Sequence, residues 1–88
     1  MYNLKPEAPE EDLLEVERKA LLALVRDQVT WRAVMKQVRI LRNSANSVLN
    51  YSMDMNEVLH ARGRKLGLEN LVENINQIAR EEEEKENG

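Results

Sequence analysis

Apolar residues recur at alternating intervals of three and four positions through the middle of this chain. Eight of the nine positions in the series are apolar, and the exception is a small serine. This spacing places all nine on one side of a helix that packs against other helices, so it predicts an all-α fold. The series, called the seam below, consists of Trp31, Val34, Val38, Leu41, Ala45, Val48, Ser52, Met55 and Leu59.

The 88 residues suffice for one domain with a small interior. Phenylalanine is absent and Tyr2, Trp31 and Tyr51 are the aromatic residues, so the interior has to be aliphatic. Aliphatic side chains suit the packing of helix on helix. The predicted fold class is therefore a small helical bundle or a coiled-coil-like assembly of two to three amphipathic helices with disordered acidic ends. A core of this size is often completed by a second copy or by another chain.

The absence of cysteine excludes disulfides, thiolate metal sites and a cysteine nucleophile. No apolar run approaches the length of a membrane span. The segment Met1–Asp12 is acidic and contains two prolines, unlike a signal or transit peptide. We therefore expect a cytoplasmic or nuclear protein that is not secreted and does not bind a membrane. Residues 1–9 are predicted to form a disordered tail.

Three helices are predicted, over about residues 10–28, 31–62 and 68–84, within a single domain 10–84 followed by a disordered tail, 85–88. The acidic residues after Pro9 suit the N-terminus of the first helix. A turn at 27–30, with Thr30 as the cap of the next helix, is favoured over one unbroken helix through 10–62. The turn would let the apolar stripe of one helix cover that of the other.

The middle helix has two weak places, the polar run at 42–47 and the segment from Asp54 to Glu57, which has the spacing of a capping box. The seam keeps its phase through both, so one helix is predicted there. Gly63 and Gly67 flank a short basic segment, and a glycine after a basic helix end is typical of a helix stop. A turn is therefore predicted at 63–67.

The residues expected at a partner interface are the large apolar members of the seam and the stripe of the third helix. They are Trp31, Val34, Val38, Leu41, Val48, Met55, Leu59, Leu68, Leu71, Ile75 and Ile78.

Charge is divided into zones along the chain. Residues 1–17 and 66–88 each carry a net charge of −5, whereas residues 18–65 carry +7. The basic middle allows a second hypothesis, a small DNA-binding or transcription-regulating protein. Its phosphate contacts would be Arg32, Lys36, Arg39, Arg42, Arg62, Arg64 and Lys65. The predicted third helix would be the reading helix of a helix-turn-helix, and its glutamates would repel phosphate, which disfavours this hypothesis.

No catalytic, cofactor-binding or metal-binding residue is predicted. His60 is the only histidine, and it stands beside the seam without a supporting nucleophile or ligand pattern. The sequence thus favours a non-enzymatic interaction module without a small-molecule substrate. Its partner would be a protein, either a second copy or another helical chain. An inhibitor that sequesters a larger enzyme would use the same surfaces.

Overall fold

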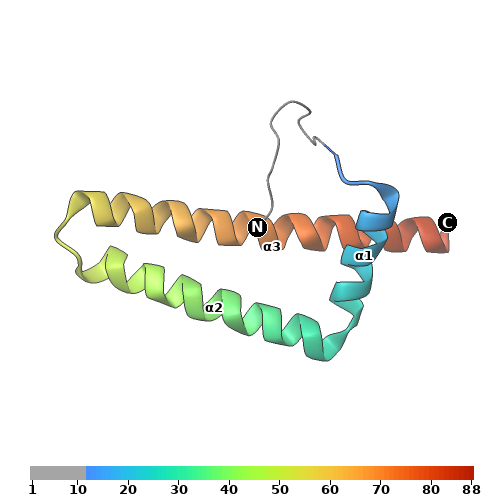
Figure 1. Cartoon of the computed structure of the whole chain (residues 1–88), viewed down its shortest axis with the longest axis horizontal. Coiled ribbons are helices and arrows are strands. Elements are labelled where there is room, and N and C mark those ends of the chain that lie inside the picture. Colours follow the sequence, from blue (N-terminus) through green and yellow to red (C-terminus); the bar gives the residue numbers. More distant parts are fainter. Residues whose placement is uncertain (1–11) are drawn as a thin grey trace, which may run out of the picture.

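The computed structural model describes residues 12–88, and all regular structure within that range is helical. The helices are α1 (Glu15–Arg26), α2 (Gln28–Tyr51) and α3 (Met55–Asn87). Helices α2 and α3 form a long antiparallel pair, and α1 crosses the far end of α3 (Figure 1). The prediction of a small all-α bundle is confirmed. The predicted tail at residues 1–9 lies outside the described residues.

Helix α1 begins later than residue 10, where the sequence placed it. Asp12, Leu13 and Leu14 precede the helix, and the Leu14 backbone N–H donates a hydrogen bond to the Glu17 carboxylate at 2.7 Å. A carboxylate in the first turn satisfies one of the backbone donors that a helix start leaves unpaired. The helix therefore starts at Glu15, where this local partner is in reach.

Asp27 separates α1 from α2 and caps both helices. Its backbone N–H donates to the carbonyl of Ala23 at 3.1 Å, and its carboxylate accepts the N–H of Thr30 at 3.1 Å. That hydrogen bond lowers the pKa of the Asp27 carboxyl. A break at 27–30 was expected, but Asp27 rather than Thr30 is the cap. Helix α1 also packs chiefly against α3, not back along α2.

The single helix expected over 31–62 is a wrong prediction, because α2 ends at Tyr51. Three residues without helical structure follow. The Ser52 hydroxyl donates to the Glu57 carboxylate at 2.8 Å and accepts the N–H of Asp54 at 3.1 Å, while Asp54 accepts the N–H of Asn56 at 2.9 Å. These local side-chain bonds stabilise a reversal of the chain although the apolar spacing continues through it.

The turn predicted at Gly63–Gly67 is also absent, and α3 runs through both glycines with negative φ angles. Its buried and half-buried positions alternate by three and four across the glycines without a break in phase. The series is Val58, Ala61, Lys65, Leu68, Val72, Ile75, Ala79 and Glu82, and Asn76 and Ile78 are half-buried beside it. Each glycine costs a helix about 1 kcal/mol relative to alanine. Packing along this continuous stripe offsets that cost.

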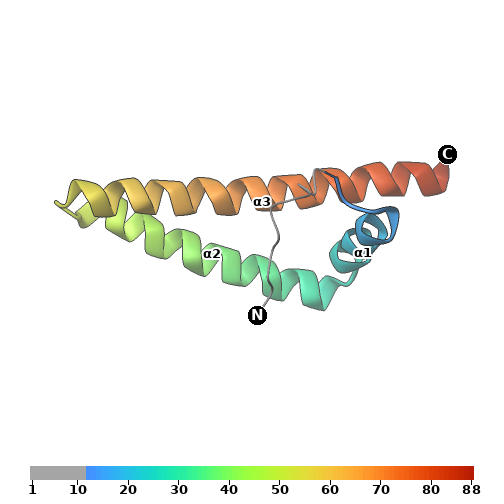
Figure 2. The ribbon, with the colours of Figure 1, turned by 45° about the horizontal axis from the view of Figure 1, so that its top comes forward.

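The predicted helix end near Glu84 is corrected to Asn87, since the glutamate-rich end of α3 pairs with cations of α1. The buried apolar core is thin and consists of Leu22, Ala45, Ala61 and Ala79. Ala45 and Ala61 are each eight residues from Met53 in the chain reversal. Helices α2 and α3 lie close together near that reversal (Figure 2). No helix in the described part is long and apolar enough to cross a membrane.

Candidate interaction groove

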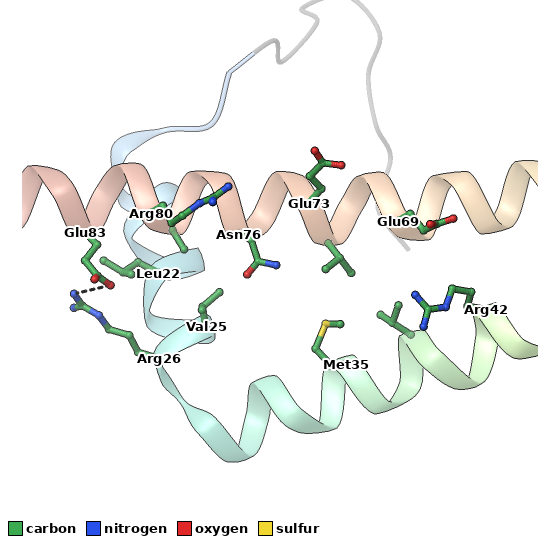
Figure 3. A pocket seen from close by; sticks show the side chains of 13 residues that line it. Leu22, Val25, Arg26, Met35, Arg42, Glu69, Glu73, Asn76, Arg80 and Glu83 are labelled. Carbon is green, nitrogen blue, oxygen red and sulfur yellow. Dashed lines mark ion pairs between the residues drawn. The ribbon is translucent and has the colours of Figure 1, made fainter.

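A groove of about 670 Å³ lies among the three helices, where α2 and α3 diverge and α1 spans the gap between them. Met35 of α2 and Asn76 of α3 point toward this space, and Val25 approaches it from α1 (Figure 3). Its apolar wall, called the floor below, is formed by Leu22, Val25, Met35, Val38, Val72 and Ala79. The groove therefore presents aliphatic surface drawn from all three helices.

Charged and polar side chains surround the floor. Arg42 stands on the α2 side, and Glu69, Glu73 and Arg80 stand on the α3 side. At the α1 end, Arg26 pairs with Glu83 at 3.7 Å and with Glu86 at 3.0 Å. An apolar floor with a polar rim is the usual anatomy of a protein-binding surface.

Helix α2 contributes a row of cations that no acid of its own balances. Its cations are Arg32, Lys36, Arg39 and Arg42, called the basic edge below, and the helix contains no aspartate or glutamate. Arg39 follows Met35 by four residues and precedes Arg42 by three, so it lies on the same flank of the helix as these two groove residues. None of the four forms an ion pair within residues 12–88.

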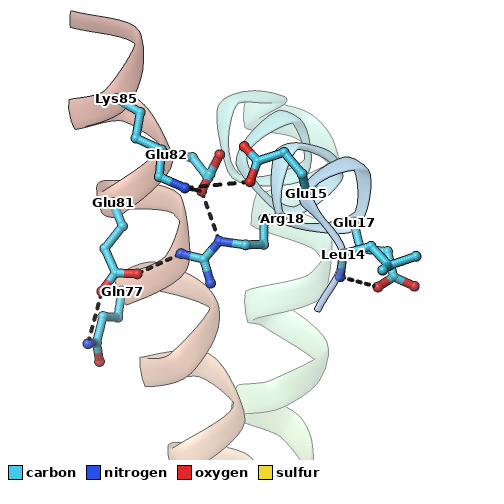
Figure 4. A network of polar contacts seen from close by, with 8 residues as sticks. All are labelled: Leu14, Glu15, Glu17, Arg18, Gln77, Glu81, Glu82 and Lys85. Atoms are coloured by element: carbon cyan, nitrogen blue, oxygen red, sulfur yellow. Dashed lines mark hydrogen bonds and ion pairs between the residues drawn. The ribbon is translucent and has the colours of Figure 1, made fainter. Parts of the chain in front are cut away.

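All six ion pairs of the described residues instead join cations of α1 or Lys85 to carboxylates of α1 and the end of α3. Arg18 donates to Glu82 at 2.8 Å and to Glu81 at 2.6 Å, and Lys85 pairs with Glu82 at 2.9 Å (Figure 4). Lys85 also approaches Glu15 at 3.5 Å. This cluster fixes α1 across α3 and thereby sets one end of the groove.

Glu82 occupies the centre of that cluster, with only 2% of its surface exposed. Its hydrogen bond from Arg18, followed by that from Lys85, lowers its pKa from an ordinary 4.5 to about 2. The same contacts raise the pKa of both Arg18 and Lys85. The pKa of Glu81 is lowered by Arg18 and then by Gln77, whose amide donates to it at 3.3 Å. No buried polar side-chain atom in the described range lacks a partner.

The structure divides the residues expected at a partner interface into two sets. Half-buried members, which the chain uses at least partly for its own packing, are Trp31, Val34, Val38, Val48, Leu68, Ile75 and Ile78. Exposed members are Leu41, Met55, Leu59 and Leu71.

Sequence reasoning missed Met35 and Arg42, which line the groove. The side of α2 that meets α3 is rotated by part of a turn from the seam. Met35, Arg42 and Leu49 on that side are half-buried, whereas Leu41 of the seam is exposed. The same spacing of three and four read through Met35 would have found this side. A charged residue, Arg42, interrupts this second apolar series, so the series is hard to recognise in the sequence.

The candidate phosphate contacts come from two antiparallel helices, four from α2 and three from α3. Arg32, Lys36, Arg39, Arg62 and Arg64 are exposed, whereas Arg42 and Lys65 are half-buried. His60 is exposed, and residues 12–88 contain no group of three or more histidine, aspartate or glutamate side chains placed to hold a metal ion.

Comparison of the chain with known protein families, with curated protein sequences and with solved structures found no match. The geometry of this chain is therefore the basis for assigning it a function.

Proposed function

We propose that this protein is a non-enzymatic helical interaction module of the cytoplasm or nucleus. It assembles through its helical faces, in the manner of a coiled coil, as a homo-oligomer or as an adaptor subunit of a larger complex. The observation that supports this most strongly is an imbalance within residues 12–88, where four apolar residues are buried while a large aliphatic surface is exposed.

The exposed apolar residues are distributed along the helices rather than confined to the chain ends. In α2 and α3 they include Ile40, Leu41, Leu59, Leu66 and Leu71, each at least 47% exposed. A monomeric domain exposes single apolar residues routinely, but rows of them on helices usually mark surfaces that bind another chain. One small core seldom supplies more than about 3–5 kcal/mol, so association is a common source of further stability.

The test is to measure the molar mass of the full chain by light scattering from low to high micromolar concentration, together with its thermal unfolding. A homo-oligomer is expected to show a mass above that of the monomer and a melting temperature that rises with concentration. A subunit of a hetero-complex should remain a monomer that melts broadly. A monomer that melts sharply and independently of concentration at a high temperature would contradict both versions.

DNA binding remains a second candidate because of one specific observation, the basic edge without ion pairs. Phosphates would neutralise such a row of cations. The acids of α3 on the other side of the groove, Glu69 and Glu73, oppose a polyphosphate ligand in the same place.

A further inference from the structure

We propose that the groove binds the apolar face of a partner helix whose edge facing α2 is acidic. This inference rests on the proposed function and specifies the chemistry of the partner. It places this partner helix on the groove between α1, α2 and α3, which is a separate surface from the exposed leucines through which the chain is proposed to assemble. Three observations support it: the shape of the floor, the charge of the rim and the ion pairs that hold α1.

The floor suits the anchors of a helix. A volume of about 670 Å³ lies within the range of about 300–1,000 Å³ that is usual for a ligand pocket. It accommodates a few side chains rather than a whole helix, so the partner helix lies over the opening and inserts aliphatic residues. Residues spaced by three, four and seven positions on an amphipathic helix supply such anchors to a hydrophobic groove.

The rim determines the charge of the partner. On the α2 side, Arg42 lines the groove, and Arg32, Lys36 and Arg39 continue the basic edge along α2 beyond the lining residues. No acid within residues 12–88 pairs with any of the four. On the α3 side, the charges are mixed, with Arg80 beside Glu69 and Glu73. Electrostatic complementarity therefore calls for acidic residues along the edge of the partner that faces α2.

The same charges disfavour two other occupants. Helix α2 of a second copy would bring four more cations to the basic edge without any acid, and like charges placed opposite one another oppose association. A nucleic acid would lie against Glu69 and Glu73 and would find an aliphatic floor where stacking or phosphate contacts are needed. An amphipathic helix with an acidic edge would pack its apolar face on the floor and pair its carboxylates with the basic edge.

The cluster around Glu82 keeps the groove formed before the partner arrives. Arg18 and Lys85 hold α1 against α3, and Arg26 holds the other end of α1 through Glu83 and Glu86. These ion pairs thereby hold Leu22 and Val25, the part of the floor that α1 contributes, in place. A groove that is preformed reduces the entropy lost on binding.

The experiment uses the full-length protein and three synthetic helical peptides of equal length. All share one seam of leucines at spacings of three and four, and one edge of each is glutamate, lysine or glutamine. Binding is measured by titration at low and physiological salt, and the site is mapped by backbone NMR shifts. The glutamate-edged peptide is expected to bind roughly tenfold more tightly than the lysine-edged peptide, as several weak surface charge pairs would together produce.

The charge-reversed variant combines Arg32→Glu with Arg39→Glu, both at exposed positions. It is expected to reverse the preference, so that the lysine-edged peptide binds more tightly. A matched control, Lys19→Glu with Arg64→Glu, makes the same change of charge at exposed positions of α1 and α3 that do not belong to the basic edge, and it should keep the preference for glutamate. Circular dichroism and the NMR spectrum of each variant establish that its helices remain.

Three results would each overturn the inference while leaving an interaction module in place. The three peptides could bind equally, or the NMR shifts could map to Leu41 and Leu71 instead of the floor. The charge-reversed variant could also keep the preference of the wild type. Failure of all three peptides to bind would also overturn it. Binding of a DNA duplex that the reversal abolishes, with no peptide binding, would replace it by the nucleic-acid hypothesis. The molar mass and unfolding measurements decide the proposed function separately.

Discussion

Glu82 shows at the scale of one residue how this chain holds α1 in place. A buried carboxylate is costly unless it is paired and hydrogen-bonded, and Arg18 and Lys85 provide both kinds of contact. In the sequence, Glu82 is one of four consecutive glutamates, a run typical of a solvated helix end. Only the crossing of α1 distinguishes it from Glu84, which forms no ion pair in the described range. Sequence periodicity placed Glu82 on the stripe of its helix but could not supply the distant cation.

The lowered pKa of Glu82 makes the stability of the α1–α3 contact depend on pH. Because its pKa falls from 4.5 to about 2 on folding, its contribution is complete above pH 4.5 and is lost as the pH falls toward 2. The melting temperature of the wild type should therefore drop across this interval. Glu82→Gln should melt at a lower temperature near neutral pH and respond less to acid. Glu84→Gln is the matched control, and curves for Glu82→Gln that run parallel to the wild type would contradict this assignment.

At the scale of the helices, the sequence predicted their number and type but misplaced four ends: the start of α1, the end of α2 and both ends of α3. The periodic apolar spacing identified three amphipathic segments correctly because burial imposes it on any packed helix. It could not locate the chain reversal at Ser52, since the hydrogen bonds of Ser52, Asp54 and Glu57 leave the apolar phase unchanged. It misplaced a turn at Gly63 because a glycine weakens a helix without ending it when tertiary packing is sufficient.

Substitution of these glycines tests the continuity of α3. A Cβ atom added at Gly63 or Gly67 would have no atom within 4 Å beyond its own helix turn. Gly63→Ala and Gly67→Ala should therefore each raise the free energy of unfolding by about 0.5–1 kcal/mol, through the higher helix propensity of alanine. Urea unfolding of the variants beside the wild type measures the change. Destabilisation by either alanine would indicate a turn at that position in solution.

The outer cations of α2 separate the two candidate functions. Lys36→Glu with Arg39→Glu changes exposed side chains, so helicity and melting should remain close to those of the wild type. The wild type should bind duplex DNA weakly at physiological salt, and the pair of substitutions should change little there. Titration of a duplex at two salt concentrations measures this. Tight, strongly salt-dependent binding that the double variant abolishes would favour DNA binding over the interaction module.

At the scale of the whole molecule, the three helices enclose little. The fully buried apolar residues are two alanines near the α2–α3 connection, Ala45 and Ala61, and two residues near the crossing of α1, Leu22 and Ala79. Several of the large apolar residues that the sequence assigns to a partner interface, Leu41 among them, are about half exposed. The sequence alone does not show which of these apolar residues pack inside the chain and which are free to bind a partner. That depends on how each helix is rotated about its own axis, which only the folded structure shows.

Two neighbouring residues of α2 test this distribution of burial. Ala45 is 1% exposed and Leu41 is 47% exposed. Ala45→Asp should cost several kcal/mol, enough to unfold a domain of this size, because it buries an unpaired charge. Leu41→Asp should cost about 1 kcal/mol or less in the monomer and should weaken association instead. Circular dichroism and light scattering of both variants provide the comparison, and loss of helicity in Leu41→Asp would show that Leu41 is an interior residue.

The central claim is that this chain is incomplete as a monomer and gains its stability from a partner. Native-state hydrogen exchange of the dilute, monomeric chain tests it most directly, because it measures the free energy of opening at each amide. We expect at most about 3–5 kcal/mol for the most protected amides of α2 and α3, with the highest values near Ala45 and Ala61, as for a small core. Protection on the order of 6 kcal/mol or more along all of α2 in the monomer would contradict it.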